Sequence, residues 1–174
     1  KLNLRAASES DGFGNQQKEI SEYILIMAKD KLKFGKPSDA IALYKLAFEI
    51  SNSATNAHIY SNFLYLQSNT EEAVNIALPA ISKNNTKALN IKLLEVLVKA
   101  SIDNNDAKNA DYYYQNLVGI DKNPDLLLAS VYMKYRGNLR ASMDFRRRVD
   151  QNLLRSNKLK SLFSQNTIER YILF

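Results

Sequence analysis

An all-α fold built from stacked helix pairs is predicted by three observations on this sequence. Five Gly and three Pro among 174 residues are few for an all-β protein, which needs a turn about every 8–12 residues. From Lys18 onward, apolar residues recur at i, i+3, i+4 and i+7, the spacing of an amphipathic helix. The segment at 35–47 recurs in degraded form at 68–80, an offset of 33 residues, which is typical of repeated supersecondary units.

The first helix pair is predicted at the start of the periodic region. Its first helix carries one apolar stripe from Ile20 to Phe34 and ends at Gly35. Pro37 opens the second helix, which runs to about Ile50. Gly after a helix end and Pro at a helix start are the expected asymmetry. Because the connection is short, the two helices are expected to be antiparallel.

Small and aromatic residues recur at set positions, namely Ala28, Gly35, Ala40, Tyr44 and Ala47 in the first repeat and Ser61, Leu64, Ala73 and Ala80 in the second, with Ser68 in place of Gly. This pattern resembles the tetratricopeptide repeat, a family of helix-turn-helix units of about 34 residues. The resemblance implies a solenoid of about four antiparallel helix pairs that ends in a C-terminal capping helix. Armadillo and HEAT-like repeats have longer periods, ~40–47 residues, and fit less well.

The later repeats match the pattern with fewer residues. Ala110 and Tyr114 place the third repeat, which needs about three extra residues in the loop near 84–87. The fourth repeat is placed by Ala129, Tyr132, Ala141 and Phe145, with Gly137 near its turn. We therefore expect a domain of residues 18–174 with repeats at about 21–54, 54–87, 91–123 and 122–155 and a final helix at 157–174.

Residues 1–17 hold Ser, Asp, Gly and Asn with little apolar periodicity and are predicted to be a flexible leader. A tether and ordinary terminal disorder both fit this composition. No run approaches the ~18 apolar residues of a membrane span. The chain opens on Lys1 instead of Met, so we expect that an N-terminal piece of unknown nature has been removed. A signal peptide or a lipid anchor is compatible with such a piece.

Residue types that carry catalysis or bind metals are scarce. The chain has no Cys, which excludes thiolate chemistry, and a single His, His58, which excludes metal sites built from a His cluster. A Ser-His catalytic triad would have to use His58. No set of residues combines a nucleophile, a base and an oxyanion site. We therefore predict a non-enzymatic protein with no catalytic residue, no metal site and no cofactor.

The predicted ligand is a protein or peptide partner, held in the concave groove that the family resemblance implies. In the repeat register, the first helix of each pair lines this groove, and Asp103 is one lining position. The candidate partner-binding residues are Lys29, Lys33, His58, Asn62, Tyr65, Lys92, Glu95, Lys99, Ser130 and Met133. Mixed apolar and cationic lining suits an extended or helical peptide with some acidic character. The alternative is that part of this set packs against the leader or the final helix.

A second candidate site is the basic stretch from Lys134 to Lys160. It holds nine Lys or Arg against two Asp, while the whole chain carries only +6, so the positive field is localised. The predicted basic patch is Arg140, Arg146, Arg147, Arg148 and Arg155. Such a patch attracts phosphate backbones, anionic lipid head groups or an acidic partner. Consecutive Arg residues on a helix face different directions, and aromatic residues do not alternate with them as base stacking requires, so a solvated helix is the simpler interpretation.

The layout of the chain also resembles bacterial tetratricopeptide proteins, often lipoproteins, that assist pilus or secretion-machine assembly at the envelope. This resemblance implies a scaffold or adaptor, and it slightly favours the periplasm or the outer membrane over the cytoplasm, which stays the alternative location. The alternative function is nucleic-acid or anionic-surface binding through the basic C-terminal helices.

Overall fold

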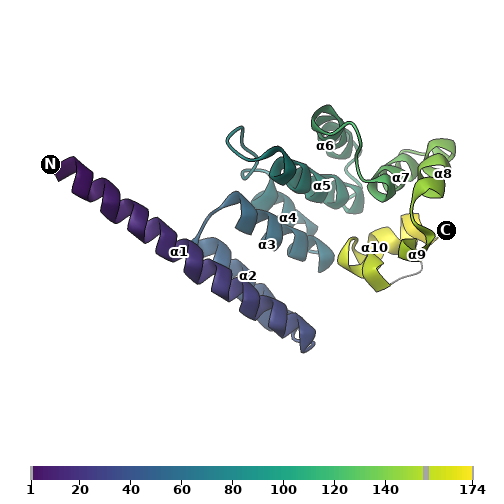
Figure 1. The fold of residues 1–174 in the computed structure, drawn as a ribbon. Coiled ribbons are helices and arrows are strands. Elements are labelled where there is room, and N and C mark those ends of the chain that lie inside the picture. Colours follow the sequence, from purple (N-terminus) through teal and green to yellow (C-terminus); the bar gives the residue numbers. More distant parts are fainter. Residues whose placement is uncertain (1, 155–156, 174) are drawn as a thin grey trace. The chain divides into compact units, whose positions relative to one another are not determined.

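The computed structural model describes the backbone of residues 2–154 and 157–173 and the side chains of residues 14–154 and 158–173. The described residues form helices joined by turns and loops, with no strand among them, which confirms the all-α prediction (Figure 1). In order, the elements are α1 (Leu2–Lys33), α2 (Pro37–Ile50), α3 (Ala54–Leu66), α4 (Thr70–Ala77), α5 (Lys87–Asp103), α6 (Ala107–Ile120), α7 (Leu126–Tyr135), α8 (Leu139–Arg148), α9 (Gln151–Leu154), the 3-10 turn η1 (Asn157–Ser161), α10 (Gln165–Thr167) and the π-helical turn η2 (Ile168–Ile172). The chain divides into two compact units within α3, between Tyr60 and Ser61.

Four turns of one geometry join α1 to α2, α3 to α4, α5 to α6 and α7 to α8. Each turn has one residue with a positive φ: Gly35 at 68°, Ser68 at 64°, Asn105 at 56° and Gly137 at 77°. At Gly35, the N–H donates to the carbonyl of Leu32 at 3.0 Å, and the next N–H, of Lys36, donates to the carbonyl of Lys31 at 2.9 Å. The same pair of bonds recurs at the other three turns and is the Schellman motif that ends many helices.

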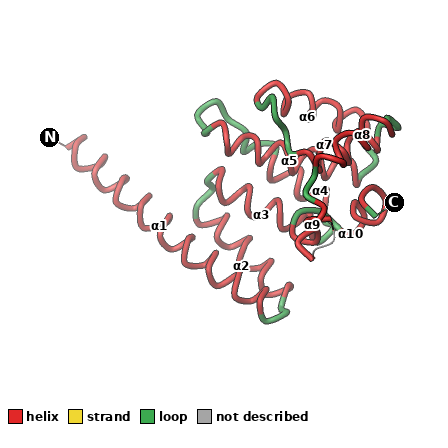
Figure 2. Tube along the Cα trace, turned by 45° about the vertical axis from the view of Figure 1, so that its right-hand side comes forward, coloured by secondary structure: helices red, strands yellow, loops and turns green. Residues whose placement is uncertain are grey.

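The intervals between these turn residues give the length of the repeat. They are 33, 37 and 32 residues. The long second interval contains the connection between α4 and α5, residues 78–86, which is drawn as a loop in Figure 2. The extra residues expected near 84–87 therefore lie in this loop.

Small side chains lie at the same distances from each turn residue. The positions seven before and five after it are Ala28 and Ala40, Ser61 and Ala73, Val98 and Ala110, and Ser130 and Ser142, and all eight side chains are buried. Small residues at such positions let the backbones of neighbouring helices approach closely. α1 and α2, α5 and α6, and α7 and α8 pack against each other as pairs.

The fourth repeat starts one residue later than the sequence predicted. Counted from Gly137, the small positions are Ser130 and Ser142 rather than Ala129 and Ala141. The two hydroxyls bond across the helix pair: Ser142 Oγ donates to the carbonyl of Ser130 at 2.8 Å, and Ser130 Oγ donates to that of Ser142 at 3.0 Å. Serine is therefore tolerated at these buried positions because each hydroxyl is satisfied.

The first unit contains α1, α2 and the start of α3. The buried side chains of α2 are Ala40, Tyr44 and Ala47. Asn56 on α3 stabilises the end of α2, because its Nδ2 donates hydrogen bonds to the carbonyls of Ala47 at 3.1 Å and Ser51 at 2.9 Å. Phe48 and Tyr60 add a tilted aromatic contact, with ring centroids 6.0 Å apart.

The predicted flexible leader needs correction, because the backbone of residues 2–17 is helical and belongs to α1. This part of α1 extends beyond α2 (Figure 1). It contains good helix formers such as Ala6, Ala7 and Glu9 and no Pro, so it continues the helix despite Gly12 and Gly14.

The second unit is organised around α5. Its residues from Val96 to Ile102 are all buried, and a helix that is buried on every side belongs to a core. α5 packs against α4, α6, α7 and α10. α6 and α7 are joined by Tyr114 and Tyr132, whose rings stack with centroids 3.8 Å apart, and by a 2.8 Å hydrogen bond from the Tyr132 hydroxyl to Asp111.

The predicted single helix at 157–174 is broken in the structure. η1 ends at Ser161, and helical structure resumes at Gln165. Between them, Ser164 adopts an extended backbone, and its Oγ accepts a 3.2 Å hydrogen bond from the N–H of Thr167. Serine is favoured at such a helix start over a helix interior, so the apolar periodicity of this stretch does not produce one continuous helix.

Candidate functional site

The C-terminal segment, residues 157–173, covers one face of the second unit. α10 contacts α5, η2 contacts α7, and the side chain of Tyr65 at the end of α3 bonds to this segment. We call the covered surface the inner face and take Tyr65, Lys99 and Asp103 as its polar groups. Tyr65 belongs to α3, and Lys99 and Asp103 belong to α5.

Tyr65 lies on the inner face with its side chain fully buried. Its hydroxyl donates to Thr167 Oγ1 at 3.1 Å and accepts a 3.0 Å hydrogen bond from the N–H of Ser164. Burial, with a smaller contribution from the negative charge of Asp103, raises the pKa of Tyr65 to about 12. The phenol therefore stays neutral and keeps its hydrogen at neutral pH.

Asp103, the last residue of α5, accepts hydrogen bonds from three side chains of the C-terminal segment. They come from the hydroxyl of Ser164, from Thr167 Oγ1 at 2.7 Å and from Asn166 Nδ2 at 3.1 Å. Hydrogen bonds to a carboxylate are stronger than those between neutral groups. Tyr65, Thr167 and Asp103 thus form a continuous chain of donors and acceptors.

Lys99 supplies the positive charge of the inner face. Its side chain is 9% exposed, and its Nζ lies 4.9 Å from the centre of the Phe163 ring, a cation–π contact. Burial lowers the pKa of Lys99, and the negative charges of Glu95 and Asp125 oppose this change. Burial in turn raises the pKa of Glu95, against the attraction of Lys99.

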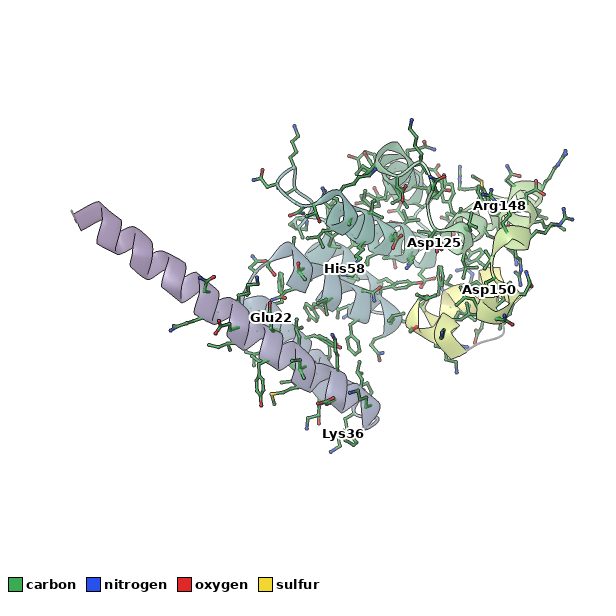
Figure 3. The ribbon with its side chains drawn as sticks, viewed as in Figure 1. Glu22, Lys36, His58, Asp125, Arg148 and Asp150 are labelled. Atoms are coloured by element: carbon green, nitrogen blue, oxygen red, sulfur yellow. The ribbon has the colours of Figure 1, made fainter. Side chains whose placement is uncertain are left out.

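A cavity of about 80 Å³ lies beside this contact. Its lining is Glu95, Lys99, Asp125, Leu128, Leu162 and Phe163. Asp125 is at the start of α7 (Figure 3), where its carboxylate accepts a 2.8 Å hydrogen bond from the N–H of Leu128. The volume is large enough for water, and its walls carry both signs of charge.

The predicted groove residues of the second unit fall into three groups. Tyr65 and Lys99 are buried beneath the C-terminal segment, and Glu95 lines the adjacent cavity. Ser130 is not on the inner face, because it faces Ser142 on α8; this corrects its assignment to the groove. Among the remaining predicted residues, Lys92 is exposed, and Asn62 and Met133 are partly exposed.

The predicted groove residues of the first unit are more accessible. Lys29 and Lys33 are exposed on α1, where Lys33 forms a 2.9 Å ion pair with Asp30, and His58 on α3 is partly exposed. Large apolar side chains of the first unit are also exposed, namely Ile20, Tyr23, Ile26 and Met27 on α1 and Phe34 in the turn that follows α1.

The basic patch is only partly assembled. Arg140, Arg147 and Arg148 are exposed on α8, and Figure 3 marks Arg148 at the end of this helix. Arg147 pairs with Asp144 at 3.6 Å, and Arg148 lies 6.0 Å from the centre of the Phe145 ring. A pocket of about 210 Å³ is lined by Met143, Arg146, Arg147 and Gln151. Arg155 lies outside the described residues.

The sequence did not identify the residues that fill the inner face. Phe163, Ser164 and Thr167 were assigned only to a capping helix. A local signal was present, because Ser followed by Thr three residues later is compatible with a capped helix start. Their partners on the inner face lie 61 to 102 positions away along the chain, and no local pattern reports such contacts.

Comparison of the chain with family models, curated proteins and solved structures gave no match. Within the described residues, no helix has the length and apolar content needed to cross a membrane. The same residues contain no group of three or more His, Asp or Glu side chains placed to hold a metal ion.

Proposed function

We propose that the chain is a non-enzymatic helical-repeat scaffold of the tetratricopeptide type, which binds a segment of a partner protein on the inner face. The four Schellman turns at intervals of 33, 37 and 32 residues support this assignment, since the family repeats at about 34 residues. The buried small residues at equivalent places in all four pairs support it as well. Repeat arrays of this kind commonly bind partners along an extended surface.

One observation carries the proposal: the inner face already holds a peptide segment through specific side chains. Asp103, Tyr65 and Lys99 bind hydroxyl, amide and aromatic groups of the chain's own C-terminal segment. A face that satisfies these groups is suited to a partner segment with the same groups. On the layout resemblance given above, we place this adaptor in pilus or secretion assembly at the bacterial envelope.

A capture experiment with envelope and cytoplasmic fractions tests this proposal. The full chain is immobilised, and captured material is compared at two salt concentrations, with and without nuclease. A scaffold retains a defined protein at the higher salt and in the presence of nuclease. Retention should be equal for wild type and for Arg146→Gln/Arg147→Gln/Arg148→Gln, because those side chains are not on the inner face.

The second candidate function is binding to an anionic polymer or surface through α8. The observation that favours it is the set of exposed Arg side chains on this helix, beside a pocket lined by Arg146 and Arg147. Binding of this type falls steeply as salt rises and is lost in the triple Gln variant. Capture of nuclease-sensitive material that disappears in that variant would replace the scaffold proposal with this one.

A further inference from the structure

We infer that the inner face recognises partner peptides in which an aromatic residue is followed directly by Ser and then, three residues after that Ser, by Thr at the start of a helix. The C-terminal segment presents this pattern at Phe163, Ser164 and Thr167 and occupies the site as an intramolecular competitor. The inference rests on the proposed scaffold function and names the chemistry of its ligand.

The spacing between Ser and Thr is fixed by the helix start. Ser164 Oγ accepts the N–H of Thr167 and also donates to Asp103, while Thr167 Oγ1 donates to the other carboxylate oxygen. The two hydroxyls reach one carboxylate because the capping turn brings them to the same side. A ligand without them leaves the Asp103 carboxylate short of donors, which is costly for a partly buried charge.

The Tyr65 hydroxyl forms hydrogen bonds with both the backbone and a side chain of the C-terminal segment. It accepts from the N–H of Ser164 and donates to Thr167. Because the N–H of Ser164 lies just before the helix, only a segment that begins a helix at this point presents it together with the Thr hydroxyl. The inner face therefore selects a helix start rather than a continuous helix.

Lys99 contacts the aromatic residue of the segment. The ring of Phe163 is 2% exposed and lies under the Lys99 ammonium group. The neighbouring cavity of about 80 Å³ shows that Phe163 leaves part of this region unfilled. A partner that fills the cavity gains packing contacts that the C-terminal segment lacks, which allows it to compete with an attached segment.

The C-terminal segment is suited to release because its helices are short. η1 has five residues, α10 three and η2 five, and helices of this length have little stability without tertiary contacts. Its hydrogen bonds to the inner face are made to Tyr65 and Asp103. An attached segment nevertheless has a high effective concentration, so a free peptide displaces it only in large excess or after that segment is weakened.

The test measures binding of a fluorescent peptide with the sequence of residues 157–173 to the full chain by anisotropy. Phe163→Ala/Thr167→Val weakens the attached segment, and Leu173→Ala, at an exposed position, is the matched control. We expect the peptide to bind the double variant at least about tenfold more tightly than the wild type or the control. Adding Asp103→Asn to the double variant should weaken binding about tenfold, and a peptide with Ala for Ser and Val for Thr should not bind.

A wild-type measurement covers the case in which the double variant loses its helical circular dichroism. Excess peptide should speed hydrogen exchange of the amides of residues 164–172 in the wild-type chain, and unchanged exchange would overturn the inference. The inference is also overturned if a folded double variant ignores the peptide, or if it forms dimers that exclude the peptide, which would assign the site to a second copy.

The inference and the scaffold proposal fail in different ways. A chain that captures a protein from the cell fractions but ignores the peptide overturns the ligand chemistry and leaves the scaffold proposal standing. A chain that binds the peptide yet retains no cellular protein supports the ligand chemistry and counts against the scaffold proposal.

Discussion

The two units use the same turn and the same small buried residues, yet their surfaces differ. In the first unit, Tyr23 on α1 is 66% exposed and Phe34, just after α1, is 77% exposed. In the second unit, the C-terminal segment covers the inner face, and its own Phe163 and Ile172 are almost fully buried. The repeat pattern thus determines how helices pair, whereas a nonrepetitive segment determines which of the paired surfaces stays open. Binding surfaces in such an array are therefore assigned from its coverage as well as from its repeat register.

The largest expected effect is on stability, and it should differ between the cores of the two units. Leu97→Ala removes a fully buried side chain from α5 and is expected to lower the free energy of unfolding by about 3–5 kcal/mol. Leu25→Ala, on α1 of the first unit, should cost about 2 kcal/mol, because α1 packs mainly against α2. Urea denaturation followed by circular dichroism measures both. Equal losses would show that the two cores are equally well packed.

The second prediction concerns the link between the inner face and the C-terminal segment. Tyr65→Phe removes both hydrogen bonds of the hydroxyl and leaves the N–H of Ser164 without its acceptor, so we expect a loss of about 1–3 kcal/mol at pH 7. Tyr112→Phe, on an exposed ring, is the matched control and should change stability by less than about 0.5 kcal/mol.

The same variant gives a pH dependence with a defined sign. The folded-state pKa of Tyr65 is raised to about 12 from 10.0. Its contribution to stability is complete below pH 10 and is lost as pH rises through about 12, because the unfolded state releases the proton first. The difference between wild type and Tyr65→Phe should therefore shrink by about 2–3 kcal/mol between pH 10 and pH 12. A constant difference would contradict the burial of this phenol.

The smallest expected effects come from the turns, where the residue with positive φ is Gly35 in the first unit and Ser68 at the first turn of the second unit. Gly35→Ala in the first unit places a side chain at a φ of 68° and should cost about 1 kcal/mol. Ser68→Gly in the second unit relieves the same strain and should stabilise by up to about 1 kcal/mol. Thermal denaturation gives the sign of each change. A loss at Ser68→Gly would mean that the Ser side chain makes a contribution larger than the backbone strain.

The features that could be predicted from the sequence are the local helices and turns and their repetition along the chain. Helical periodicity, Gly35 and Pro37 located the first pair, and the offset between repeats located the second. The fourth repeat was misplaced by one residue because Ala129 and Ala141 were preferred over Ser130 and Ser142 as small residues. The hydrogen bonds that make buried serine acceptable form only in the folded helix pair.

The candidate site was predicted in part. Tyr65, Lys99 and Asp103 were expected at lining positions from the repeat register, and the structure brings them to one face. Their occupant was missed, because Thr167 meets Tyr65 across 102 positions of sequence. Pattern reasoning assigns a face to each helix, but which distant segment fills that face depends on tertiary packing.

Hydrogen exchange of the wild-type chain, resolved by peptide fragments, tests the central claim most directly. The amides of residues 164–172 are compared with those of Leu93 to Ile102 in the core of α5. If the inner face is a binding site with an exchangeable occupant, the C-terminal segment opens by itself, with an opening free energy at least about 2 kcal/mol below that of α5. Equal opening free energies would mean that the segment leaves only on global unfolding, and that it is a permanent part of the core.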